Sequence, residues 1–119
     1  MKIILPVNEK SMKVNVNSSF GRANYFLLYN SKTKEQLYLE NIAQFSSGGA
    51  GIKAAQIIVD SGANVVLTER CGENAANVLK KAGVALYQVN ENTKVEKAIN
   101  DFLQDKLPLL LEHHSYHRK

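Results

Sequence analysis

The sequence predicts a single α/β domain built on a five-stranded mixed sheet. Three observations lead to this prediction: strand-like segments fill the first half of the chain, helical and strand-like segments alternate from Ser46 onward, and 45% of the 119 residues are hydrophobic. Alternating strands and helices favour a sheet covered by helices, and this apolar content is enough for one core. The predicted order is three strands, then helix, strand, helix, strand and helix.

Three strands are expected in the first half. The apolar run at residues 3–7 is typical of a strand that is covered on both faces, and residues 25–29 form a second strand. A polar turn then leads into residues 36–42, where Leu37 and Leu39 alternate with polar side chains. This alternation predicts a hairpin whose last strand is half exposed at a sheet edge.

Three helices are expected in the second half, because apolar residues recur there at helical spacing. These residues are Ile52, Ala55 and Val59, then Ala75, Val78, Leu79 and Ala82, and finally Val95, Ala98, Ile99, Phe102 and Leu103. Gly62 and Gly83 follow the first two segments, where a left-handed residue commonly ends a helix. Thr93 and Glu96 have the spacing of a capping box for the third helix, and Pro108 is expected to end it.

Strands at residues 65–67 and 84–89 complete the sheet. Short right-handed crossovers would set them parallel to the first strand, with the hairpin extending the sheet on the other side. The predicted strand order is 3-2-1-4-5, between two helical layers. This is the ribonuclease-H-like, three-layer arrangement. We expect the domain to span residues 1–111, with residues 112–119 as a flexible, His-containing tail.

Charge and composition exclude several classes of protein. The formal net charge of +4 is spread along the chain rather than clustered among aromatic residues, so a nucleic-acid partner is not expected. Apolar runs of five or six residues are too short to span a membrane, and the N-terminus lacks the apolar region of a secretory signal. The single cysteine forms no internal disulfide, which fits a cytoplasmic location.

An anion pocket is predicted at the carboxyl ends of the parallel strands, where ligands collect in open α/β sheets. Three segments converge there: the loop 8–22, the turn 48–51 and the turn 68–72. The two turns open helices, whose first N–H groups and positive dipole ends attract anions, and Arg22 and Arg70 add positive charge. The alternative is that the glycines only permit tight turns between strands and helices.

Cys71 is the most reactive residue type in these turns. Beside Arg70 at a helix N-terminus, its thiol pKa is expected to fall, which would suit metal ligation or redox chemistry. The alternative is a small packing residue. His113, His114 and His117 lie in the tail, either as a weak metal-binding tract or as a solvated end. Because all three are in the tail, a histidine partner for a cysteine nucleophile is not expected.

Two functions, two-metal nuclease activity and nucleotide binding, are disfavoured by the residues present. A two-metal nuclease needs clustered carboxylates at the strand ends, but the first strand has none and the fourth offers only Glu69. The sequence contains neither a GxGxxG motif nor a Walker A motif, so the two simplest kinds of nucleotide-binding site are not expected.

Four sequence elements resemble the dinitrogenase iron–molybdenum cofactor biosynthesis domain from about Lys2 to Leu107. They are Ser19-Phe20-Gly21-Arg22-Ala23, Gly48-Gly49-Ala50-Gly51, Gly62-Ala63-Asn64-Val65-Val66-Leu67 and Leu79-Lys80-Lys81-Ala82-Gly83-Val84. The resemblance implies a ribonuclease-H-like fold and a small protein that is not an enzyme, since most members are of that kind. It also implies cluster binding, because some members bind or carry iron–molybdenum or related metal–sulfur clusters. Ser19 stands where members often have histidine, and residues 69–72 replace a glycine-rich turn.

The sequence and the resemblance together favour a non-catalytic carrier of an anionic metal–sulfur cluster or thiometallate. The candidate binding residues are Arg22, Gly48, Gly49, Gly51, Arg70, Cys71 and Gly72, with Cys71 as the candidate metal ligand. Cofactor-assembly proteins are expected partners of a monomer or weak homodimer. The competing interpretation is a metal-free protein-interaction or regulatory domain that uses the third strand as an exposed edge. A phosphate binder at residues 48–51 is a third interpretation.

Overall fold

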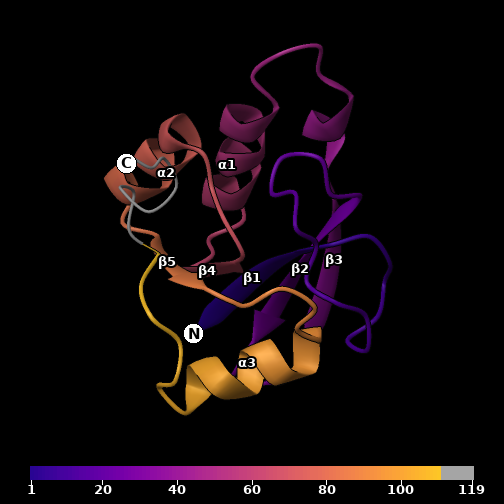
Figure 1. Ribbon diagram of the computed structural model, residues 1–119, viewed down its shortest axis with the longest axis vertical. Helices are drawn as coiled ribbons and strands as arrows, with labels where there is room; N and C mark the ends of the chain where they lie inside the picture. The colour runs from indigo at the N-terminus through magenta and orange to yellow at the C-terminus, as the bar shows by residue number, and fades with distance from the viewer. Residues whose placement is uncertain (111–119) are drawn as a thin grey trace.

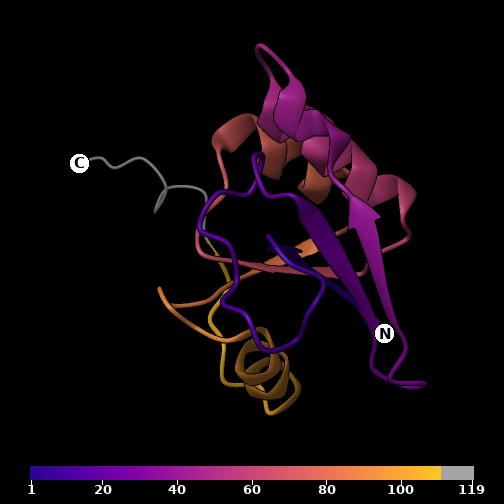
Figure 2. The same ribbon diagram turned by 90° about the vertical axis from the view of Figure 1, so that its right-hand side faces the viewer.

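The computed structural model describes residues 1–110, which form a five-stranded sheet between two helical layers (Figures 1 and 2). The elements are β1 (Lys2–Val7), β2 (Tyr25–Asn30), β3 (Gln36–Glu40), the 3₁₀ helix η1 (Ile42–Phe45), α1 (Ala50–Asp60), β4 (Val65–Thr68), α2 (Glu73–Lys81), β5 (Ala85–Gln88) and α3 (Val95–Leu103). Every predicted strand and helix is present.

The strand order β3-β2-β1-β4-β5 confirms the predicted mixed sheet. β1, β2 and β3 pair antiparallel, whereas β1, β4 and β5 pair parallel. α1 and α2 cover one face of the sheet and α3 covers the other (Figure 1). Alternate residues of a strand therefore enter different cores: Ile4 packs under α1 and α2, while Ile3 and Leu5 pack towards α3.

The third strand is the exposed edge that the sequence predicts. β3 pairs only with β2 among the described strands, and Leu37 on it is 56% exposed. The strand ends at Glu40 rather than at residue 42, because the side chain of Asn41 accepts the N–H of Ala43 and starts η1. The apolar residues Ile42 and Phe45 of η1 are also exposed.

The predicted capping box of α3 is wrong. Thr93 donates its hydroxyl to the carbonyl of Asn90 at 2.6 Å instead of capping the helix. The first helical N–H groups donate instead to backbone carbonyls of the long loop: Val95 N–H to Val14 at 2.9 Å and Glu96 N–H to Met12 at 3.1 Å. The loop thereby satisfies the helix terminus and needs no capping side chain.

α3 also ends earlier than predicted. The helix stops at Leu103, and two residues later Asp105 adopts a positive φ of 61°. Pro108 therefore lies beyond the helix rather than at its end. No helix within residues 1–110 is long and apolar enough to cross a membrane. His113, His114 and His117, and the whole predicted tail, lie outside the described residues.

Candidate functional site

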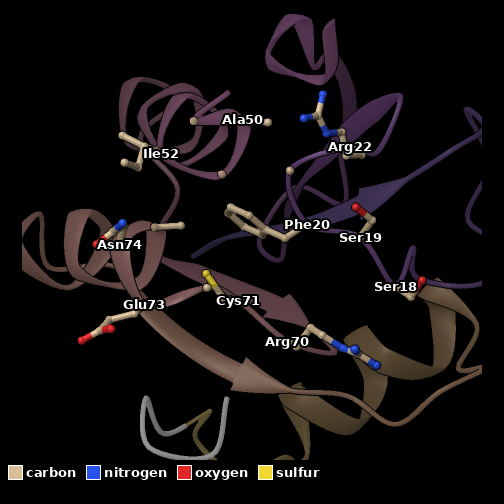
Figure 3. A pocket seen from close by; sticks show the side chains of 15 residues that line it. Ser18, Ser19, Phe20, Arg22, Ala50, Ile52, Arg70, Cys71, Glu73 and Asn74 are labelled. Carbon is tan, nitrogen blue, oxygen red and sulfur yellow. The ribbon is translucent and has the colours of Figure 1, made fainter. Parts of the chain in front are cut away.

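A cavity of about 740 Å³ lies where the N-termini of α1 and α2 meet, beyond the ends of β1 and β4 (Figure 3). Its lining comes from residues 18–22, 49–52 and 70–75. These are the three segments that the sequence predicts to converge. Arg22, Gly49, Gly51, Arg70, Cys71 and Gly72 all line the cavity, whereas Gly48 does not.

Both helices begin without a capping side chain. Gly49 is the N-cap of α1 and Gly72 is the N-cap of α2, and neither has a side chain to accept a hydrogen bond. The first backbone bonds are Lys53 N–H to Gly49 at 3.1 Å and Ala76 N–H to Gly72 at 2.9 Å. Within residues 1–110, the N–H groups of residues 50–52 and 73–75 therefore have no acceptor.

The uncapped termini give the cavity a positive character without a buried cation. Unpaired N–H groups carry the partial positive charge of a helix, so two termini at one cavity add their fields there. Gly49 adopts φ +69°, a left-handed conformation that favours glycine. Gly72 has φ −64°, and a Cβ there would meet nothing within 4 Å, so the backbone conformation does not require glycine at this position.

The loop of residues 20–23 packs directly on the first turn of α1. A Cβ placed on Gly21 would lie 3.1 Å from the Gly51 nitrogen and 3.2 Å from its Cα. The fully buried Asn41 holds this loop, since its Nδ2 donates to the carbonyls of Gly21 at 3.0 Å and Ala23 at 2.9 Å. Asn41 was not singled out from the sequence, because it falls within the half-exposed strand predicted at residues 36–42.

Arg22 supports the loop between η1 and α1. Its Nη1 donates to the carbonyls of Gln44 at 2.6 Å and Ser46 at 2.9 Å. In Figure 3 its guanidinium points away from Cys71, towards the upper rim of the cavity. Arg22 therefore helps to set the path of the chain into Gly49, and its charge is partly engaged by these carbonyls.

Arg70 is the second cation at the cavity. Its side chain is exposed, and it has no hydrogen bond or ion pair with any other side chain of the described part of the chain. The Arg70 side chain extends from the end of β4 away from Cys71 (Figure 3). The side chain of Glu73, in the first turn of α2, also points away from Cys71, in the opposite direction. Arg70 can therefore reach a ligand at the rim but does not contact the cavity floor.

Cys71 forms part of the cavity floor beside Phe20 (Figure 3). It is only 3% exposed and belongs to the apolar cluster under α1 and α2. Burial raises the pKa of the Cys71 thiol to about 12. This reverses the predicted fall, because desolvation of a thiolate outweighs the attraction of the helix terminus. The packing role is the interpretation that this environment supports, and the thiol is protonated at neutral pH.

This raised pKa predicts a loss of stability at alkaline pH. The folded thiol has a pKa of about 12, whereas an unfolded cysteine ionises near ~8.5. The stabilising contribution is complete below the unfolded value and is lost as the pH rises through the interval towards 12. We expect the urea midpoint to fall between pH 8 and pH 10, and this slope to be shallower in Cys71→Ala. Equal slopes in the two proteins would contradict the assignment.

The fold and the site define a small α/β protein with two uncapped helix N-termini at one cavity. The chain belongs to the dinitrogenase iron-molybdenum cofactor family, whose model matches residues 1–105. This confirms the resemblance that the Phe20-Gly21-Arg22-Ala23 and Gly48–Gly51 elements carry.

Known relatives are similar to the chain over most of its length. An uncharacterized protein of Methanocaldococcus jannaschii is 30% identical over 110 residues, which are 90% of this chain and 89% of the relative. The apo form of the orange protein from Desulfovibrio gigas is 34% identical, with a TM-score of 0.87 over 91% of each chain. A putative NifB protein from Thermotoga is 28% identical, with a TM-score of 0.80 over 99% of this chain and 97% of the other.

Proposed function

We propose that the protein is a non-catalytic carrier of an anionic metal–sulfur species, either an iron–molybdenum type cluster or a thiometallate. The observation that carries this proposal is the meeting of two uncapped helix N-termini at one cavity. Sulfides of metal clusters carry negative charge and accept N–H hydrogen bonds, which tune such clusters in proteins. The N–H groups of residues 50–52 and 73–75 are donors of that kind.

The cavity suits a compact guest. Its volume of about 740 Å³ falls in the ordinary range for small-molecule sites, which is roughly 300–1,000 Å³. Gly49, Gly51 and Gly72 place no side chain over the amides, so a ligand can approach the backbone. Arg70 would neutralise charge at the rim. Cys71 would form the floor as a neutral thiol, and we assign binding to the amides rather than to metal–thiolate bonds.

The comparisons support a cofactor-related role. The family is described as dinitrogenase iron-molybdenum cofactor, and one similar structure is a putative NifB protein. The orange protein was solved in its apo form, a term for a protein without a group that it binds. We therefore propose cofactor-assembly proteins as partners in the cytoplasm, and a ribonuclease-H-like scaffold used for binding rather than for catalysis.

Anaerobic titration with tetrathiomolybdate tests the proposal. We expect the absorption spectrum of the anion to shift and saturate near one equivalent, and Cys71→Ala to retain this binding within about threefold. Raised salt should weaken binding, because the attraction is electrostatic. Unchanged spectra in both proteins would rule out the carrier function. Competition by inorganic phosphate at similar concentration would instead support a phosphate binder.

A metal-free interaction domain remains the second candidate. The observation that favours it is the exposed edge strand β3, where Leu37 is 56% exposed, beside η1 with Phe45 at 81%. Exposed edges pair with strands of other chains. A concentration-dependent dimer in sedimentation, disrupted by Leu37→Lys without loss of thiomolybdate binding, would support this function independently of the cavity.

A further inference from the structure

A second cavity of about 250 Å³ lies across the end of β4 from the first one. Its polar lining consists largely of Asn8, Glu9, Asn15, Asn17, Glu69 and Asn92. No lysine, arginine, histidine or cysteine is among its lining residues. The cavity thus presents two carboxylates and several amide groups, and the proposed anion carrier uses none of them.

Glu69 is the residue that requires an explanation. It is only 9% exposed, yet its carboxylate has no hydrogen bond or ion pair anywhere in residues 1–110. Along β4, Val65 and Leu67 face the core under α3, and Glu69 continues this parity beyond the strand end. Glu69 lines the second cavity, whereas Cys71, two residues further on, packs in the other core and lines the first cavity.

A buried carboxylate without a partner is costly, because it has lost its hydration without gaining a hydrogen bond or a counter-charge. No ion pair joins Glu69 to a lysine or arginine among residues 1–110. Lys10 lies over the ring of Tyr25 at 5.3 Å, and Lys13 pairs with Glu96 at 3.9 Å. Arg70, the next residue, is exposed and lines the first cavity, so Glu69 has no counter-charge in contact within residues 1–110.

We propose that this cavity binds a hard divalent cation, with Ca²⁺ the best fit. The donors are all oxygens or amides, and such sets select hard cations over Zn²⁺ or copper. Ca²⁺ accepts carboxylates together with neutral amide oxygens in flexible geometries, whereas Mg²⁺ keeps most of its water. Glu9, Asn15 and Asn92 have no side-chain hydrogen bond in the described part of the chain, so their oxygens are available beside Glu69.

The test is calorimetric titration of chelator-treated protein with CaCl₂, alongside MgCl₂ and ZnCl₂. We expect saturable Ca²⁺ binding that raises the melting temperature, since a ligand specific for the folded state stabilises it. Glu69→Gln should weaken Ca²⁺ binding at least tenfold and should melt no lower than the parent without Ca²⁺, because it removes an uncompensated buried charge. Glu40→Gln, on the exposed edge strand, is the matched control and should bind Ca²⁺ like the parent.

Amide chemical shifts locate the ion. With Ca²⁺, the largest changes should fall on residues 8–17, 69 and 92. Absence of binding, shifts that map elsewhere, or Glu69→Gln binding Ca²⁺ as tightly as the parent would each overturn the proposal. Preferential Zn²⁺ binding would also overturn it, because the oxygen-rich lining predicts the opposite order.

Discussion

A Gly72→Asp variant is expected to lose thiomolybdate affinity by at least about tenfold, or roughly 1.4 kcal/mol, without losing stability. Gly72 has the extended conformation of an N-cap, and its Cβ position is open. An aspartate there can accept the N–H of residue 74 or 75, which occupies donors that the anion would use. Its negative charge also repels the anion. Calorimetric or spectroscopic titration measures the loss of affinity.

The same substitution should leave the free energy of unfolding equal or raise it. Aspartate is a better N-cap than glycine by a few tenths of a kcal/mol, and its charge favours the helix dipole by about 0.3–1 kcal/mol. Urea unfolding checks this. Binding would then fall because donors are occupied, not because the protein unfolds.

Two controls separate charge from capping. Gly72→Asn caps the helix without adding charge and should give an intermediate affinity. Asn100→Asp adds the same charge on α3, on the opposite face of the sheet, and should bind like the parent. If Gly72→Asp binds thiomolybdate as tightly as the parent, the N-terminus of α2 is not part of the site.

The fold could be predicted because its determinants are local. Apolar runs identified the buried strands, and helical spacing identified the helices. Gly62 and Gly83 both adopt φ +79° after α1 and α2, so the sequence needed glycine where each helix ends. The capping-box prediction was wrong although Thr93 and Glu96 have the right spacing. The first amides of α3 donate instead to carbonyls of a loop that is distant in sequence, which a local pattern cannot reveal.

The candidate site was predictable in position but not in its side-chain directions. Strand polarity alone brings residues 18–22, 49–52 and 70–75 to one edge. Cys71 directly precedes the N-cap Gly72, and its thiol packs in the apolar cluster, a direction that strand polarity does not determine. The partners of Arg22 and Asn41 are carbonyls of the short helix η1 and of irregular loops, which sequence periodicity does not describe.

Gly21→Ala is expected to destabilise the protein by about 1–3 kcal/mol, the usual cost of inserting a methyl group into a packed contact. The new Cβ would lie 3.1 Å from the Gly51 nitrogen and 3.3 Å from the Ala50 carbonyl carbon. These are backbone atoms, so no side chain can rotate away to make room. Asn41 resists movement of the loop through its bonds to Gly21 and Ala23. Urea unfolding measures the loss.

The strain should also reach the site, because the atoms that must move belong to the first turn of α1. Amide shifts in Gly21→Ala should concentrate at residues 49–53, and thiomolybdate affinity should fall together with them. Gly51→Ala is the matched control: its Cβ would lie 3.6 Å from the Ala75 Cβ, an ordinary contact, and alanine favours a helix interior by up to about 1 kcal/mol over glycine. We expect Gly51→Ala to unfold no earlier than the parent. If Gly21→Ala proves equally stable, the contact of Gly21 with Gly51 does not fix the start of α1, and the orientation of its amides must be set by the left-handed N-cap Gly49 instead.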